Sequence, residues 1–241
     1  MSDLKKLYEG KAKTVFEGPS PDEVLIYFKD DTTAFNGEKK EQISGKGEVN
    51  HEITRYIFRY LSENGIPTHY LKNVDERTIL AKKVRIIPIE FVVRNIAAGS
   101  ISKRLGIPEG KKLEPTVLEF YLKDDSLGDP IINQYHIQAL SLCGDKEMLT
   151  AVEYSFRINV LLSELFRKSG MNLVDFKIEF GITTDGKVVL ADEISPDSCR
   201  LWDIGTGNIM DKDIFRKGLN GMMDKYSEVL DRIREELDGK S

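Results

Sequence analysis

Cysteine and histidine are scarce in this chain, and their scarcity argues against several kinds of site. The 241 residues include two cysteines, Cys143 and Cys199, and three histidines that lie far apart in the sequence. Two isolated cysteines do not make a disulfide framework, which favours a reducing, cytoplasmic setting. Because no cysteine or histidine pair has the spacing of a zinc ligand set, we do not expect a zinc site.

Long apolar runs and a basic excess are also missing. No hydrophobic segment approaches the roughly 20 residues that a membrane-spanning helix needs, and the N-terminal sequence MSDLKKLYEG lacks the apolar core of a signal peptide. A formal net charge of -5 argues against general binding to nucleic acid or to a membrane surface, since both need a basic excess. We therefore expect neither kind of partner.

What remains is the composition of an ordinary globular protein. Hydrophobic residues make up 40% of the chain and charged residues 31%. A chain of this length can bury a large core, either as one domain or as two lobes around a cleft. Internal repeats and low-complexity tracts are absent from the sequence.

The order of predicted elements indicates an α+β protein with two lobes, a β-rich lobe at residues 1–83 and a larger lobe at residues 84–241. Short strands dominate about the first eighty residues, with one helix at about 49–62 that stops at Asn64-Gly65. Two strands that meet near Lys83 place the boundary there. The second lobe should contain, in order, a loop-rich segment at 106–145, a helix at 146–168, a hairpin, and a helix at 211–237 whose apolar stripe includes Phe215 and Leu219.

The hairpin at residues 174–200 carries charges on a strand that otherwise looks buried. Side chains alternate faces along a strand, so Asp175, Lys177 and Glu179 share one face and apolar side chains share the other. The strand VVLA that returns from the turn looks buried on both faces. Charged groups in such surroundings need partners.

The turn of this hairpin predicts which charges meet. Asp185-Gly186 is a strong two-residue turn signal, which pairs Thr184 with Lys187 and places Glu179 opposite Asp192. Two facing carboxylates repel unless a cation lies between them, and Mg²⁺ prefers one or two carboxylates together with substrate phosphates. The alternative is a solvated outer face on which a lysine neutralises its neighbours.

A glycine motif near the N-terminus, residues 8–14 (YEGKAKT), is a second candidate. Glycine lets backbone N–H groups approach a phosphate, and Lys11 and Lys13 would fall on one face of a strand. The motif is not a Walker A loop. A hairpin with two solvated lysines is the alternative reading.

Arginine and serine residues around RNIAAGS (94–100) form a third candidate. Ser100 could cap a short helix whose N-terminus, together with Arg94, would bind a phosphate. Arg200 follows the polar SPDS loop and could return to the same pocket, where its planar fork suits phosphate or carboxylate. The alternative is an ordinary capped helix with Arg94 paired to a surface acid.

The loop KDDSLGDP (123–130) is the weakest candidate. Lys123 could contact a phosphate and one of its acids could bind a metal, although such a sequence is most often a solvated turn. Trp202 and Cys199 receive no functional role, because core packing explains both equally well or better.

Taken together, these segments resemble the SAICAR synthetase family of purine biosynthesis. The similarity is collinear over essentially the whole chain. Its most specific blocks are IIPIEFVVRNIAAGS (86–100) and LVDFKIEFG (173–181), and LYEGKAK, DDTTAFNG, LGDP and DEISPDSCRLWD support them in the expected order. One block could arise by chance, whereas the ordered set hardly could.

The resemblance implies a fold, a reaction and a set of site residues. The fold would be two-lobed and ATP-grasp-like, and the protein a homodimer. The reaction would join L-aspartate to the carboxylate of carboxyaminoimidazole ribotide (CAIR), with ATP and Mg²⁺ as cofactors. The implied nucleotide contacts are Gly10, Lys11, Ala12, Lys13, Lys82, Val84 and Lys123. The implied metal ligands are Glu179, Asp192 and Asp129. The implied ribotide contacts are Arg94, Ser100 and Arg200 for its phosphate, and Asp175 and Lys177 for its ribose and carboxylate. The residues expected to act in catalysis are Lys13, Lys177, Glu179 and Asp192.

Amide formation at a carboxylate requires activation, which predicts an acyl phosphate intermediate. Since every reactant is anionic, positioning and charge neutralisation should dominate catalysis. A small-molecule kinase with the same cleft is the main alternative, although no HRD-like catalytic segment is present. A nucleotide-binding module without activity is a third possibility, against which the presence of every candidate residue argues.

Overall fold

The computed structural model describes residues 4–34 and 39–239. The N-terminal part forms a five-stranded antiparallel sheet in the order β1-β2-β3-β7-β6. Its strands are β1 (Lys6–Glu9), β2 (Lys13–Glu17), β3 (Glu23–Phe28), β6 (Tyr70–Asn73) and β7 (Thr78–Lys82). A separate hairpin of β4 (Asp31–Ala34) and β5 (Lys39–Gln42) follows β3. Buried and partly exposed residues alternate along β3, and its buried residues contribute to the small core of this sheet.

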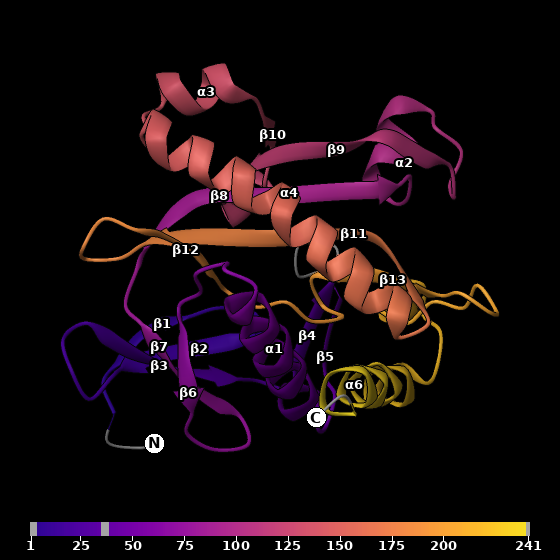
Figure 1. The fold of residues 1–241 in the computed structure, drawn as a ribbon, viewed down its shortest axis with the longest axis horizontal. Helices are drawn as coiled ribbons and strands as arrows, with labels where there is room; N and C mark the ends of the chain where they lie inside the picture. The colour runs from indigo at the N-terminus through magenta and orange to yellow at the C-terminus, as the bar shows by residue number, and fades with distance from the viewer. Residues whose placement is uncertain (1–3, 35–38, 240–241) are drawn as a thin grey trace.

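A second, six-stranded sheet spans the upper half of the molecule in Figure 1, above the N-terminal sheet. Its order is β10-β9-β8-β11-β12, and β13 also pairs with β11. The strands are β8 (Arg85–Ile96), β9 (Lys112–Leu122), β10 (Ile131–Ile132), β11 (Met171–Ile182), β12 (Val188–Ala191) and β13 (Cys199–Asp203). β12 and β13 pair with successive halves of β11, so this strand is central to the larger sheet.

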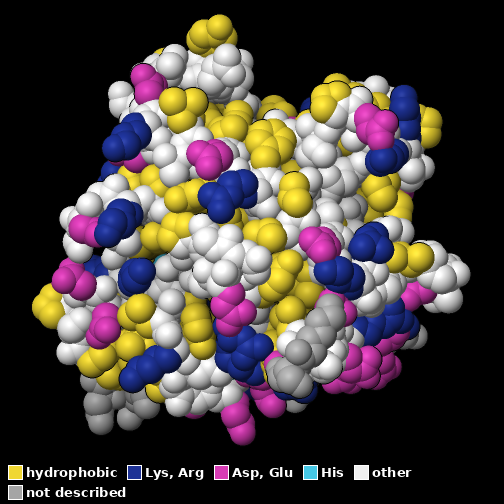
Figure 2. Space-filling model, viewed as in Figure 1, with side chains coloured by type: hydrophobic (Ala, Val, Ile, Leu, Met, Phe, Trp, Pro, Cys, Tyr) yellow, Lys and Arg dark blue, Asp and Glu magenta, His cyan; other side chains and the backbone are white. Residues whose placement is uncertain are grey.

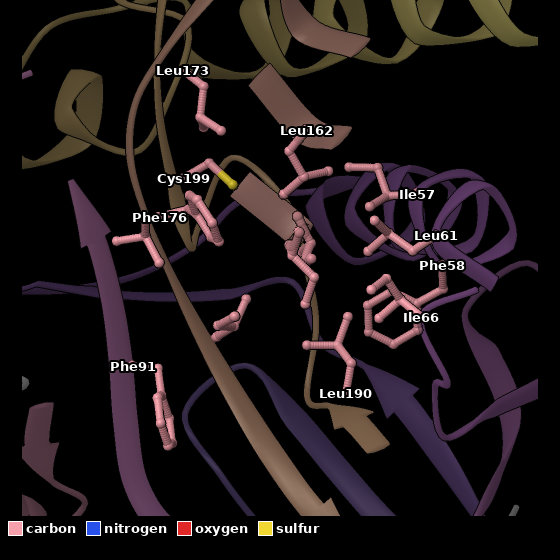
Figure 3. Close-up of a cluster of buried hydrophobic side chains, with 14 of the residues drawn as sticks. Ile57, Phe58, Leu61, Ile66, Phe91, Leu162, Leu173, Phe176, Leu190 and Cys199 are labelled. Carbon is pink, nitrogen blue, oxygen red and sulfur yellow. The ribbon is translucent and has the colours of Figure 1, made fainter. Parts of the chain in front are cut away.

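Three long helices cover the sheets. α4 (Asp145–Lys168) lies across β11 and β8, while α1 (Lys46–Glu63) and α6 (Met222–Asp238) lie beside each other below the larger sheet (Figure 1). Apolar side chains of α1, α4 and β11 meet in one large core, part of which Figure 3 shows. Short helices fill the connections: α2 (Ser100–Leu105), η2 (Asp125–Leu127), α3 (Gln134–Ala139) and α5 (Asp213–Arg216). Within the described ranges, no helix combines the length and apolar character needed to cross a membrane.

The two sheets are joined by hydrogen bonds as well as by the chain. The His69 backbone N–H donates to the Leu190 carbonyl (2.8 Å), and the Lys82 N–H donates to the His69 carbonyl (2.7 Å). The chain passes between the sheets at Lys83, where the sequence predicts a lobe boundary. Because α1 contributes to the core of the larger sheet, the division into 1–83 and 84–241 remains a prediction.

Most of the predicted elements are confirmed, but two predictions were wrong. The segment 106–145 contains the eleven-residue strand β9, which the sequence conceals because Pro115 and Glu119 interrupt its apolar alternation. The helix predicted at 211–237 is two helices, α5 and α6. Between these helices lie Gly218 and Gly221, whose φ angles are positive, 69° and 82°. The helix therefore breaks there, and Leu219 is exposed rather than buried.

Candidate active site

A cavity of about 610 Å³ lies where the two sheets meet, and it collects most of the predicted site residues. The glycine motif contributes from the N-terminal side, and β8, β11 and the segment after β12 contribute from the other. The lining includes every residue predicted for nucleotide and metal, namely Gly10, Lys11, Ala12, Lys13, Lys82, Val84, Lys123, Asp129, Glu179 and Asp192, together with Lys177. Residues distant in sequence therefore converge as predicted.

The glycine motif is the turn between β1 and β2. The Gly10 N–H donates to the Lys13 carbonyl (2.8 Å), and a Cβ at Gly10 would lie 3.2 Å from the Tyr8 ring. Lys13 begins β2, whereas Lys11 lies in the turn and pairs with Asp125 (2.6 Å). The prediction that both lysines share one face of a strand was therefore wrong, although both line the cavity.

The hairpin of β11 and β12 forms, but its register differs by one residue from the prediction. Ile182 pairs with Val188, and Glu179 stands opposite Ala191 rather than Asp192. The Thr183 hydroxyl accepts the Lys187 N–H (3.0 Å), which closes a loop of three residues, 184–186, instead of a two-residue turn. A three-residue loop with glycine in the left-handed region is a common hairpin connection, and Gly186 has φ 79°.

Asp192 still reaches the cavity, because the chain turns away from the sheet at this residue. It is the first residue after β12 and has a positive φ of 61°, which is uncommon for a residue other than glycine. Its carboxylate pairs with Lys13, whose ammonium group also lies 3.2 Å from Glu193. Strained backbone of this kind gathers at functional sites.

The charges of this pair reinforce each other. Burial disfavours the charged form of both groups, but the attraction of Asp192 and Glu193 outweighs it and raises the pKa of Lys13. Burial likewise acts against ionisation of Asp192, yet Lys13, Lys177 and Lys123 together lower the pKa of its carboxyl. Asp192 is therefore an anion and Lys13 a cation at neutral pH.

The carboxylate that faces Glu179 across the sheet is Glu90 on β8. The Lys177 ammonium lies between them, 2.5 Å from Glu90 and 3.2 Å from Glu179. Lys123 also pairs with Glu179, at 2.7 Å. We call Lys13, Lys123 and Lys177, with Glu179 and Asp192, the lysine cluster. A facing carboxylate pair is present, but it is formed by Glu179 and Glu90, so the prediction that Glu179 faces Asp192 was wrong.

The lysine cluster fits a magnesium ion that binds together with nucleotide phosphates. Glu179 and Asp192 offer hard oxygen ligands, and ammonium groups contact both. No group of three or more potential ligands occurs among the residues that the structure describes, so Asp129 does not join Glu179 and Asp192 in one ligand set as predicted. Mg²⁺ commonly binds one or two carboxylates and takes its other ligands from phosphate and water. Asp129 lines the same cavity, and its Oδ1 accepts the Asp124 N–H (3.0 Å).

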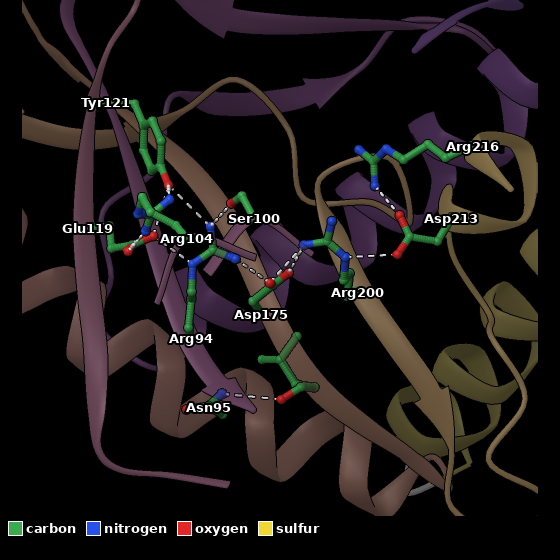
Figure 4. Close-up of polar contacts among 11 residues, drawn as sticks. Arg94, Asn95, Ser100, Arg104, Glu119, Tyr121, Asp175, Arg200, Asp213 and Arg216 are labelled. Carbon is green, nitrogen blue, oxygen red and sulfur yellow. Dashed lines mark hydrogen bonds and ion pairs between the residues drawn. The ribbon is translucent and has the colours of Figure 1, made fainter. Parts of the chain in front are cut away.

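Most of the predicted ribotide residues form a second group, which Figure 4 shows. Asp175, the member on β11, lies on the same face of that strand as Lys177 and Glu179. Arg94 donates to Asp175 (2.7 Å) and to the Ser100 hydroxyl (3.0 Å). Arg200 donates to the same Asp175 carboxylate, at 2.8 Å and 3.1 Å. We call Arg94, Ser100, Asp175 and Arg200 the arginine cluster. The predicted convergence of Arg94 and Arg200 is confirmed, although these residues do not line the 610 Å³ cavity.

Ser100 does not cap the helix that it begins. The N-cap of α2 is Gly99, with φ 61°, and no side-chain hydrogen bond caps that helix. A Cβ at Gly99 would lie 2.5 Å from Arg200 Nη2, so only glycine permits the guanidinium to approach so closely. The Ser100 hydroxyl instead accepts from Arg94, which corrects the predicted capping role.

Several cavity residues escaped the sequence reasoning: His69, Glu90, Glu193, Ser198, Lys212 and Arg216. The last two were assigned to the final helix, where charged residues look like a solvated face. Glu90 could have been found only from the pairing of β8 with β11, for which no connecting turn gives the register. Asn36, which received no role, lies outside the described residues.

Comparison with known proteins gives one consistent result. A SAICAR synthetase family model matches residues 6–233. The phosphoribosylaminoimidazole-succinocarboxamide synthase of Clostridium botulinum strain Alaska E43 is 54% identical to this chain over 233 residues, covering 97% of it and 99% of the relative.

Solved structures agree with the sequence comparison. The crystal structure of phosphoribosylaminoimidazole-succinocarboxamide synthase from Ehrlichia chaffeensis has a TM-score of 0.93 at 43% identity, covering 95% of this chain and 98% of that one. A SAICAR synthetase in complex with ADP has a TM-score of 0.91 at 42% identity, with 94% and 96% covered. These matches confirm the predicted α+β, SAICAR synthetase-like fold. The chain therefore belongs to the SAICAR synthetase family, the ATP-dependent ligases that join L-aspartate to CAIR in purine biosynthesis.

Proposed function

We propose that this ligase activates CAIR as an acyl phosphate, with Mg-ATP at the lysine cluster and the ribotide phosphate at the arginine cluster. The observation that carries this proposal is the arrangement of both clusters along one face of β11. An oxygen of the CAIR carboxylate would attack the γ-phosphorus, and the bond to the β–γ bridging oxygen would break to release ADP. The aspartate amine would then attack the acyl carbon, lose a proton and expel phosphate.

The side chains suit these steps through their charge and position. Lys13 and Lys123, both in the cavity, would pair with nucleotide phosphates, and Gly10, Lys11 and Ala12 would bring backbone N–H groups near them. Lys82 and Val84, at the crossing between the sheets, would hold the base end of the nucleotide.

Lys177 would face the reacting carboxylate of CAIR, and Asp175 the ribose. Glu179 and Asp192 would hold Mg²⁺, which supplies charge neutralisation for the transferred phosphoryl group. Asp129, which lines the same cavity, would be a further ligand only if it moved toward them. The residues proposed to act in catalysis are therefore Lys13, Lys177, Glu179 and Asp192.

The acyl phosphate is tested by following oxygen during turnover. CAIR labelled with ¹⁸O in its carboxylate should transfer one labelled oxygen to the inorganic phosphate, because that oxygen bridges carbon and phosphorus in the intermediate. Phosphate without label would overturn the proposal. Omitting aspartate separates the kinase alternative, since a kinase would still make its phosphorylated product at full rate.

We further propose that the protein is a cytoplasmic homodimer that binds neither nucleic acid nor membrane. Both cysteines are unpaired, as is usual in a reducing compartment. The residues Leu149, Phe156 and Val160 are exposed and apolar on α4, where a second copy could cover them. Lys and Arg side chains lie among Asp and Glu side chains on the face drawn in Figure 2. Sedimentation velocity at micromolar concentration tests the dimer: a single monomeric species would contradict it.

A further inference from the structure

Glu90 lies in the cavity next to a residue proposed to act in catalysis. It pairs with Glu179 across the β8–β11 ladder, so the two side chains share a face. Lys177 lies two residues before Glu179 on that face, within reach of both carboxylates. The Glu90 side chain is 14% exposed and the Lys177 side chain 33%. Among the described residues, Lys177 is the only cation that forms an ion pair with Glu90.

Lys177 therefore has two carboxylate partners, and the nearer is Glu90. The ammonium nitrogen is 2.5 Å from Glu90 Oε1 and 3.2 Å from Glu179 Oε1. The same Glu179 oxygen also accepts from Lys123, at 2.7 Å. Glu179 thus shares one oxygen between two lysines, whereas Glu90 serves one.

The two carboxylates differ in what else they are expected to bind. Glu179 is a proposed metal ligand, so the metal ion and the Lys177 ammonium would compete for its carboxylate oxygen. Glu90 stands on the neighbouring strand β8, and its carboxylate pairs with the Lys177 ammonium. A long lysine side chain without a fixed partner samples many rotamers, and each ordered rotamer carries an entropic cost.

We propose that Glu90 is a positioning residue that holds the Lys177 ammonium at the reacting carboxylate of the ribotide while Glu179 serves the metal. This inference rests on the proposed function, because it takes Lys177 to face that carboxylate. Glu90 itself touches neither nucleotide nor ribotide in this proposal. Its effect should therefore pass entirely through Lys177.

A double-mutant cycle tests this dependence. Glu90→Gln keeps the size of the side chain but removes its charge, and should lower kcat by about 10- to 100-fold, the range for losing one charged hydrogen bond. Lys177→Met should lower kcat further. In the Lys177→Met background, Glu90→Gln should have no additional effect, because the group that it positions is gone.

The outcomes separate this inference from the proposed function. If Glu90→Gln lowers kcat by the same factor with and without Lys177, the positioning role is wrong while the ligase mechanism stands. If Lys177→Met turns over like the wild type, the proposed role of Lys177 fails, and this inference fails with it. Partial recovery of kcat in Glu90→Asp would support the role of the charge.

The affinity for ADP gives a readout that is independent of turnover. Calorimetric titration with ADP and MgCl₂ should give Glu90→Gln a dissociation constant within about twofold of wild type, since Glu90 acts on Lys177 rather than on the nucleotide. A large loss of ADP affinity would instead place Glu90 in the nucleotide site and overturn the proposal. Glu17→Gln is the matched control: Glu17 pairs with Lys5 at 2.7 Å on the exposed face of β2 and does not line the cavity.

Discussion

The lysine cluster and the arginine cluster lie on one face of β11, yet they are built from different cations. In the arginine cluster, Arg94 and Asp175 are buried and hold each other in fixed hydrogen bonds. In the lysine cluster, ammonium groups contact carboxylates as point charges on flexible stems. A guanidinium fork fixes geometry, whereas an ammonium group exchanges partners readily. The difference predicts rigid binding of the ribotide phosphate proposed at the arginine cluster, and rearrangement of the lysine cluster around the Mg-ATP proposed there.

Replacing Asp192 should produce the largest loss, because it removes a charge on which the lysine cluster depends. We expect Asp192→Asn to lower kcat by about 100- to 1,000-fold, as for loss of one strong electrostatic contact in a transition state. The variant should still fold, since Glu193 remains beside Lys13. Steady-state ADP release and a thermal melt measure the two effects. Turnover like that of the wild type would contradict the proposal that Asp192 binds the metal.

Replacing Arg200 should affect the other substrate. Arg200 contacts both oxygens of Asp175 and donates its Nε–H to Asp213 (2.9 Å), a set that lysine cannot reproduce. We expect Arg200→Lys to raise the KM for CAIR about 10- to 100-fold and to leave the KM for ATP nearly unchanged. Initial rates with each substrate varied in turn provide the measurement. An equal rise in both KM values would show that the clusters do not work separately.

Replacing Gly99 tests the rigid geometry of the arginine cluster with a smaller expected effect. A Cβ there would lie 2.5 Å from Arg200 Nη2, so Gly99→Ala should displace the guanidinium and raise the KM for CAIR by about tenfold, smaller than the loss of the fork itself. Gly106→Ala is a control for positive φ alone, because Gly106 has ψ 24° in the left-handed region whereas Gly99 has ψ -124°. Gly106 also has positive φ, but its added Cβ would meet nothing within 4 Å. Equal effects of the two substitutions would mean that backbone strain, not Arg200, is responsible.

The sequence predicts which residues make up the two clusters better than it predicts the strand register that brings them together. Local patterns identify α1, α4, the hairpin and the motifs that carry Lys13, Arg94 and Arg200. The register of the hairpin was missed, because the Thr183 hydroxyl binds the Lys187 backbone and lengthens the loop. Such a side-chain contact leaves no mark in the pattern of apolar residues.

Glu90 was missed for a different reason. β8 and β11 are separated by a long stretch of chain, and neither hydrophobic alternation nor a turn fixes their register. Alternation predicts which face a residue occupies, but not which residue stands opposite on a distant strand. Because this pairing is long-range, the sequence does not reveal Glu90, which is the carboxylate nearest to the Lys177 ammonium.

The last prediction uses pH to test the surroundings of the lysine cluster. His69 lines the cavity and is 3% exposed. Burial lowers its pKa from 6.5 to about 4, against the opposing attraction of Asp192. Well above pH 6.5 the ring is neutral in both the folded and the unfolded chain. As pH falls from 6.5 toward 4, the unfolded chain binds a proton that the folded protein does not, so the free energy of unfolding decreases across this window.

We expect this histidine to account for about 2 to 3 kcal/mol of the stability lost by pH 4.5. His69→Gln should lose correspondingly less, because glutamine does not titrate. Urea denaturation between pH 4.5 and 7.5 gives the two curves. Parallel curves for His69→Gln and wild type would show that the pH dependence arises elsewhere. A flatter curve would show that His69 stays neutral in the folded protein next to Asp192 and Lys13, and a neutral, buried neighbour strengthens the attraction between those two charges.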